Sequence, residues 1–142
     1  MNGLYLIAHL AGRTVAIAAE QVESVVDIGQ VTPVPRASRG VRGLAALRSR
    51  VVTVIDSYAM LGLAAPETGS RRAVVTRVEG HHYAMMVDAL EDVAIFEQQP
   101  LTGGMSFDGE WARAARGVVT RDGEPILVLD LTALLPVMAE AA

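Results

Sequence analysis

The chain matches itself when its two halves are aligned, and this internal duplication limits the folds that it can adopt. With an offset of 68 residues, positions 15–25 align without a gap on positions 83–93. With an offset of 74 residues, positions 52–56 align on positions 126–130. Internal repeats of this kind indicate a structure built twice from one supersecondary unit. The approximate repeats, within a single domain of residues 1–142, are residues 4–63 and 72–137.

Short apolar runs punctuated by glycine predict a mainly β protein. Runs rich in valine, isoleucine and leucine are typical of strands, and few windows of this chain carry the apolar spacing of a helix. Each repeat holds five such runs, which are too few for a sandwich but enough for a small barrel that closes its own edges. The sequence therefore predicts two packed five-stranded barrels, one from each repeat. The ten predicted strands are residues 4–10, 14–19, 22–31, 41–47, 51–55, 73–78, 83–87, 93–96, 117–120 and 126–129.

Two short helices are predicted, one after the strands of each repeat. Residues 57–63 and 131–138 carry apolar residues at helical spacing. Each segment follows an aspartate, Asp56 or Asp130, and aspartate is among the preferred residues for capping a helix N-terminus. Because the two aspartates recur at the same place in both repeats, we interpret them as helix caps rather than as an acid–base pair.

The sequence carries no motif with an established catalytic mechanism. It lacks a P-loop, a dinucleotide-binding turn, an H-E-x-x-H zinc helix and a G-x-S-x-G elbow, and it has no cysteine. We interpret Glu20 and Asp88, which match between the repeats, as residues at a junction between strand and turn. We interpret His81 and His82 as exposed turn residues, and neither these nor His9 has further ligands at a usable spacing. The sequence predicts no catalytic residue, no metal and no cofactor.

Charge is distributed unevenly along the chain. All 12 basic residues are arginine, against 16 acidic residues, and the net charge of -4 disfavours binding to a phosphate backbone. Five of the arginines fall in one segment that has none of the aromatic residues with which single-strand binders stack bases. The segment is therefore either a solvated face or a protein-recognition surface. The five arginines are Arg36, Arg39, Arg42, Arg48 and Arg50.

The sequence does not predict insertion into a membrane. Although 51% of the residues are hydrophobic, no run approaches the ~18 uninterrupted apolar residues of a spanning helix. Residues 1–13 lack the basic leader and the cleavage site of a secretory signal. The sequence therefore predicts a cytoplasmic protein.

Blocks in both halves of the chain resemble the CheW family of bacterial chemotaxis coupling proteins. The first half has V-P-R, then V-R-G-L-A-A-L-R and V-V-T-V-I-D, and the second half has the hairpin and the closing strands of the family. The resemblance covers about residues 4–136 and implies a CheW-like domain of two five-stranded SH3-like barrels. The resembling blocks are residues 34–36, 41–48, 51–56, 80–93 and 117–130.

The resemblance implies an adaptor without catalysis. Members of the family link the cytoplasmic tip of chemoreceptors to the regulatory domain of a CheA-type histidine kinase, which is itself CheW-like. We therefore expect these two partners, no nucleic acid and no direct insertion into the membrane. The expected location is the cytoplasm, with recruitment to membrane-associated receptor arrays.

The resemblance also implies a receptor-binding groove. Arg48 is the strongest candidate in it, since this arginine belongs to the family-like Leu-Arg turn and lies within the arginine-rich segment. The family commonly has glycine after this arginine, whereas this chain has Ser49. The residues that match the receptor-facing groove of the family are Val22, Val25, Gly43, Leu47 and Arg48.

Two alternative functions stay open from the sequence. A CheW-like interaction module can serve a histidine kinase outside chemotaxis. A small β-barrel can also bind nucleic acid, and such binding would depend steeply on salt concentration.

Overall fold

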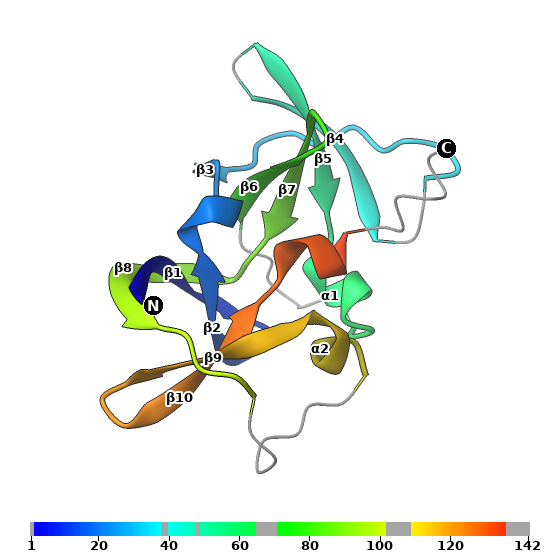
Figure 1. The fold of residues 1–142 in the computed structure, drawn as a ribbon. Helices are drawn as coiled ribbons and strands as arrows, with labels where there is room; N and C mark the ends of the chain where they lie inside the picture. Colours follow the sequence, from blue (N-terminus) through cyan, green and yellow to red (C-terminus); the bar gives the residue numbers. More distant parts are fainter. Residues whose placement is uncertain (1, 38–39, 48, 65–70, 102–108, 136–142) are drawn as a thin grey trace.

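The structure, a computed structural model, describes residues 2–37, 40–47, 49–64, 71–101 and 109–135 (Figure 1). Each of the ten predicted strands overlaps a strand of the structure, which confirms the prediction of a mainly β protein. The strands are β1 (Asn2–Leu10), β2 (Arg13–Ala18), β3 (Ser24–Asp27), β4 (Val41–Leu47), β5 (Arg50–Ile55), β6 (Arg72–Val78), β7 (His81–Met86), β8 (Ala89–Glu97), β9 (Ala115–Arg121) and β10 (Glu124–Leu129). The helices are η1 (Ala19–Gln21), α1 (Ser57–Met60), α2 (Gly109–Ala114) and η2 (Leu131–Leu134), where η denotes a 3-10 helix.

The two predicted helices are present but shorter than predicted. Helix α1 is a single turn, because Gly62 adopts a positive φ of 74° and ends it, as glycine often does after a helix. The second predicted helix is the 3-10 helix η2, and residues 136–138 of that prediction lie outside the described residues. Helices η1 and α2 were not predicted, because they are too short to show a helical repeat of apolar residues.

The ten strands form two five-stranded sheets that lie one above the other in Figure 1. The strand order is β8-β1-β2-β10-β9 in one sheet, which we call barrel A. The order is β3-β6-β7-β5-β4 in the other sheet, which we call barrel B. Neighbouring strands are antiparallel except β2 with β10 and β5 with β7, which are parallel.

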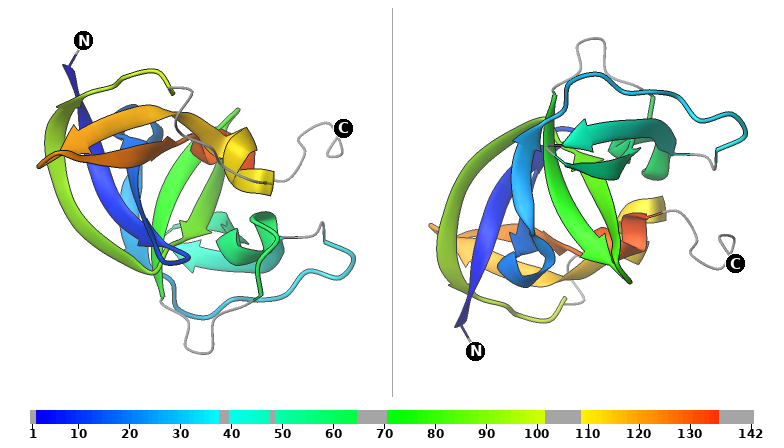
Figure 2. Two further views of the ribbon diagram at one scale, coloured as in Figure 1. Left: turned by 90° about the horizontal axis from the view of Figure 1, so that it is seen from below. Right: turned by 90° about the horizontal axis from the view of Figure 1, so that it is seen from above.

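Each barrel contains strands from both repeats, so the prediction of one barrel per repeat is wrong. The hairpin β1–β2 of the first repeat lies between β8 and β10 of the second and pairs with both, and Figure 2 shows β1 beside β8. The hairpin β6–β7 of the second repeat likewise joins β3, β4 and β5 of the first. The period-2 pattern of a strand does not specify its partner, so the sequence could not show this exchange of hairpins.

A two-residue bridge closes each barrel at the same place. In barrel B, Thr32 pairs with Leu44 of β4, with N···O distances of 2.8 and 2.9 Å between their backbone groups. In barrel A, Gln99 pairs with Val118 of β9, at 2.7 and 2.9 Å. These bridges join the chain after β3 to β4, and the chain after β8 to β9. They pair edge groups that would otherwise stay open.

The closing bridges require glycine at two positions that match between the repeats. A Cβ atom on Gly43 would lie 2.3 Å from the backbone oxygen of Thr32, and the φ of Gly43 is 152°. A Cβ atom on Gly117 would lie 2.7 Å from the backbone oxygen of Gln99. Close approach of two backbones therefore explains why Arg-Gly recurs in both repeats.

The apolar side chains form three cores. One core fills barrel A and includes Tyr5 and Ile7, and one fills barrel B and includes Val52 and Val54. The third and largest lies between the barrels and contains Leu6 of β1 together with residues of both sheets. Alternate residues of β1 thus point into barrel A and into this central core. Burial on both faces explains why the strands are almost continuously apolar.

We expect alanine at Gly43 to destabilise the protein by about 2–3 kcal/mol, because its Cβ would overlap a backbone carbonyl that cannot move without opening barrel B. Gly117→Ala should have the same effect on barrel A. The control is Gly29→Ala, where no atom lies within 4 Å of the added Cβ and the cost should stay within about 0.5 kcal/mol. Urea unfolding of the three variants measures the difference, and equal stability of Gly43→Ala and Gly29→Ala would contradict the closure role.

Candidate protein-interaction surface

Two of the predicted receptor-binding residues, Val25 and Leu47, line one groove. The groove has a volume of about 580 Å³ and lies between β3 and the tip of the β4–β5 hairpin. Val52 and Val75, from the apolar core of barrel B, line its floor, and Leu47 packs against the same core. The groove is therefore an opening into the barrel with an apolar floor and a charged rim. Its lining residues are Glu23, Ser24, Val25, Val26, Asp27, Leu47, Ser49, Arg50, Val52 and Val75.

Two further predicted residues, Val22 and Gly43, are not among the residues that line this groove. Val22 packs against the central core and lines a neighbouring hollow, which it shares with Thr76 and Arg77. Gly43 is buried beneath the closing bridge of barrel B. Its close approach to the backbone of Thr32 explains the glycine without any contact to a partner protein. Arg48 lies outside the described residues. Receptor binding by the five residues stays a prediction.

An exposed apolar strip on β1 and β8 was not found from the sequence. Leu4 lies directly opposite Ile95 across the two strands, and their exposed fractions are 49% and 68%. Val93, two residues before Ile95, is 52% exposed and lies opposite Leu6, which belongs to the central core. The strip of Leu4, Val93 and Ile95 thus continues outward from the core against which Val22 and Val25 pack. The sequence did carry a signal for this strip, because the predicted strand 93–96 is apolar on both faces. Only one face of a strand lies inside the barrel, so the other face leaves apolar side chains exposed.

The arginine-rich segment does not form one positive patch among the described residues. Arg42, near the start of β4, pairs with Asp56 at 3.3 Å. Arg50, at the start of β5, pairs with Glu23 at 2.7 Å. Because β4 and β5 are antiparallel, these two arginines lie at opposite ends of the hairpin. Arg39 and Arg48 lie outside the described residues.

The aspartates Asp56 and Asp130 cap helices, as predicted. The carboxylate of Asp56 accepts a hydrogen bond from the backbone N–H of Ala59 at 3.2 Å. The carboxylate of Asp130 accepts one from the backbone N–H of Thr132 at 3.1 Å. An arginine at the same position of each repeat pairs with the cap, since Arg116 lies 3.4 Å from Asp130 just as Arg42 lies near Asp56.

Of the second matched pair of acids, Glu20 and Asp88, only Asp88 has a structural role among the described residues. Asp88 follows β7, and its Oδ2 accepts hydrogen bonds from the backbone N–H of Ala11 and from the Tyr58 hydroxyl, both at 2.8 Å. The hydrogen bond to the Asp88 carboxylate raises the pKa of Tyr58, because ionising the phenol would remove its donor and add a negative charge. Glu20 is exposed on η1. Asp88 therefore ties the β1–β2 turn of barrel A to helix α1.

The prediction that His81 and His82 are exposed turn residues is wrong for His82. The turn consists of Glu79 and Gly80, whose φ values of 51° and 82° define a tight two-residue hairpin turn. His82 is the second residue of strand β7. Its side chain is 15% exposed, and its Nε2 lies 3.0 Å from Oε2 of Glu23. Within the described ranges, no group of three or more histidine and acidic residues could hold a metal ion.

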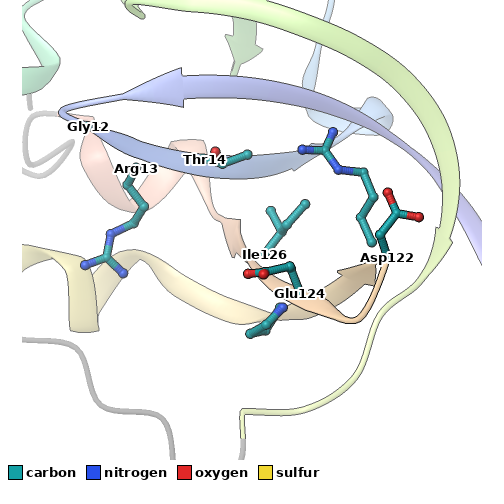
Figure 3. Close-up of a pocket in the computed structure, with 8 residues that line it drawn as sticks. Gly12, Arg13, Thr14, Asp122, Glu124 and Ile126 are labelled. Atoms are coloured by element: carbon teal, nitrogen blue, oxygen red, sulfur yellow. The ribbon is translucent and has the colours of Figure 1, made fainter.

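The end of barrel A holds a second, more polar pocket (Figure 3). Its volume is about 620 Å³, and it lies where the tips of the β1–β2 and β9–β10 hairpins meet. Arg13 and Asp122 lie on opposite sides of it, and Ile126 lies between them. The guanidinium of Arg13 lies 4.6 Å from the ring centre of Trp111, which ties this barrel end to helix α2. A rim with both signs of charge suits recognition of a protein surface better than recognition of a polyanion.

Two apolar surfaces and a charged barrel end on a double β-barrel define the protein as an interaction module. The family model for the CheW-like domain matches residues 4–138. The chain therefore belongs to the CheW-like domain family. As a member, it is a non-catalytic scaffold protein of chemotaxis signalling.

Curated relatives and a solved structure agree with this assignment. The chain is 24% identical to the chemotaxis protein CheW of Thermotoga maritima over 87% of this chain and 81% of that protein. It is 29% identical to the chemotaxis protein CheW of Rhizobium meliloti over 74% of this chain and 69% of that protein. The crystal structure of the scaffolding protein TtCheW from Thermoanaerobacter tengcongensis has the same fold, with a TM-score of 0.80 and 21% identity over 96% of this chain and 94% of that chain.

No helix in the part of the chain that the structure describes has the length and apolar character needed to cross a bilayer.

We expect Asp130→Ala to destabilise the protein by about 1–2 kcal/mol at neutral pH through loss of the cap. Burial opposes ionisation of Asp130, but hydrogen bonds from Thr132 and Gln21 and the charge of Arg116 outweigh it and lower its pKa. A lowered pKa means that the carboxylate stabilises the fold above its ordinary pKa and loses this effect as the pH falls through the lowered value. Urea unfolding at several pH values should therefore show the gap to the natural protein narrowing below about pH 4. A gap that stays constant on acidification would contradict a charged cap.

Proposed function

We propose that this protein couples the cytoplasmic tip of a chemoreceptor to the regulatory domain of a CheA-type histidine kinase. Membership of the CheW-like family and the relatives named CheW support this proposal. The observation that carries it is the exposed apolar strip of Leu4, Val93 and Ile95 on the adjacent strands β1 and β8. A monomeric domain exposes such a strip at a cost unless a partner covers it.

The strip fits a helical partner. Leu4 and Ile95 stand side by side on adjacent strands, and Val93 stands one step further along β8, so the strip runs along two strands. A helix with one apolar stripe can lie on such a surface and place residues three and four apart against it. A helical hairpin at the tip of a receptor has this shape.

The kinase contact belongs on a different face, because coupling requires both partners to be bound at once. We assign it to the polar end of barrel A, where Arg13, Asp122 and Glu124 surround Ile126. A CheW-like kinase domain would offer a similar barrel end, with charges of both signs that can pair across the contact. Each contact alone can be weak, since an array of receptors and kinases gains affinity from multivalent binding.

The strip is tested with Ile95→Glu, since the side chain of Ile95 is 68% exposed and its replacement leaves the cores intact. We expect at least tenfold weaker binding of a soluble receptor-tip fragment, about 1.4 kcal/mol, and unchanged binding of the kinase regulatory domain, both by titration calorimetry. The matched control is Val51→Glu on β5, which changes another exposed apolar residue, 61% exposed, away from the strip. Equal affinity of the two variants for the receptor fragment would overturn the assignment of this face.

Arg48 is tested in the same assay. If Arg48 meets a receptor carboxylate at a partly desolvated contact, Arg48→Ala should cost about 2 kcal/mol or more of receptor binding and far less of folding stability. Arg121→Ala is the control, because Arg121 lies on barrel A, where it pairs with Glu91 at 3.1 Å. Small and equal losses of receptor affinity in both variants would mean that Arg48 belongs to a solvated face.

A further inference from the structure

Three side chains from separate parts of barrel B meet at the edge of the groove. Glu23 precedes β3, Arg50 begins β5 and His82 lies at the start of β7. Nη1 of Arg50 donates to Oε1 of Glu23 at 2.7 Å and to Nε2 of His82 at 2.6 Å. Nε2 of His82 is also 3.0 Å from Oε2 of Glu23. The cluster therefore ties the tip of the β4–β5 hairpin to the chain that leads into β3.

The same nitrogen of His82 cannot serve both neighbours in one protonation state. When the imidazole is neutral and its proton lies on Nδ1, Nε2 accepts the hydrogen bond from Arg50. When the ring is protonated, Nε2 carries a hydrogen, which it can donate to Glu23 but which faces the N–H of Arg50. Two cations at 2.6 Å then repel each other, so Arg50 has to leave.

Charged groups of both signs face His82 from the elements around it. Arg77 lies directly opposite His82 on β6 and adds a third positive charge. Glu20 and Glu23 line the neighbouring hollow with Arg77, and Glu23 is the acid that contacts the histidine. The hydrogen bond from Arg50 lowers the pKa of Glu23, so this acid stays ionised while the solution is weakly acidic. Histidine is the side chain that ordinarily changes its charge between about pH 5 and 8.

The opposite barrel provides a comparison within the same molecule. Glu91 occupies the position in the second repeat that Glu23 occupies in the first, and it also contacts a histidine and an arginine. His9 lies 3.4 Å from Glu91 and Arg121 lies 3.1 Å from it. Among the described residues, no hydrogen bond joins His9 to Arg121. Protonation of His9 therefore strengthens its pair with Glu91 without displacing the arginine.

We propose that Glu23, Arg50 and His82 form an acid-released latch that holds the tip of the β4–β5 hairpin against β3. At neutral pH, Arg50 bridges Glu23 and His82 and the tip is held. In weak acid, protonated His82 donates its Nε2 hydrogen to Glu23, and Arg50 leaves both partners. Because Ser49 and Arg50 line the groove together with Val25 and Leu47, release of the tip widens the groove. The pair of Arg50 and Glu23 is half exposed, so it holds the tip weakly enough for one proton to change its state.

The latch is tested on the full chain without any partner, so its failure would leave the proposed function untouched. Backbone order parameters of Ser49 and Arg50 are measured by nuclear magnetic resonance between pH 7.5 and 5.5. We expect them to fall from about 0.85 to below about 0.6 as the pH is lowered over this range. His82→Gln should remove this response, whereas His9→Gln should keep it.

A second variant keeps the test decisive if His82→Gln does not fold. In Arg50→Gln the tip should already be mobile at pH 7.5 and should not respond to acid. The proposal is overturned if the tip of the natural protein stays ordered down to pH 5.5. It is also overturned if His82→Gln shows the same acid response as the natural protein.

Discussion

The central core between the barrels is the constraint on which the rest of this structure depends. Leu6 and Leu10 of β1 point into it, while Tyr5 and Ile7 of the same strand fill barrel A. Because β1 is buried on both faces, its removal from barrel A would expose the central core as well as the core of barrel A. Because hairpins are also exchanged between the repeats, neither repeat can form a complete barrel alone. The two barrels are therefore one cooperative unit, although each has five strands of its own.

The surfaces available to partners follow from this arrangement. The exchange places β1 beside β8, and only this pairing puts Leu4 next to Ile95. It also places β3 at the edge of barrel B, where a groove separates it from the β4–β5 hairpin. The ends of the barrels consist of hairpin turns and charged residues. A scaffold that holds two partners needs two contact surfaces, and the apolar strip and the polar end of barrel A share no residue.

The duplication preserved the framework and let the surface diverge. Matched residues with backbone or capping roles, such as Gly43 with Gly117 and Asp56 with Asp130, have the same contacts in both repeats. Glu23 and Glu91 also match, and each pairs with one histidine and one arginine. Only the histidine beside Glu23 touches the arginine as well. The contact between Arg50 and His82 thus distinguishes the proposed latch from the simple ion pairs around Glu91.

The sequence by itself determined the strands, the helix caps and the number of barrels, because alternation of apolar residues and capping aspartates act locally. It also indicated Val25 and Leu47, which do line one groove. Only the tertiary structure decided which strands pair, because a strand pattern carries no information about its partner over long distances. For the same reason the strip of Leu4, Val93 and Ile95, the buried role of Gly43 and the contact of His82 with Glu23 were out of reach. Each joins residues that are far apart in the sequence, and the strip and the contact of His82 with Glu23 also require the two hairpins to exchange barrels.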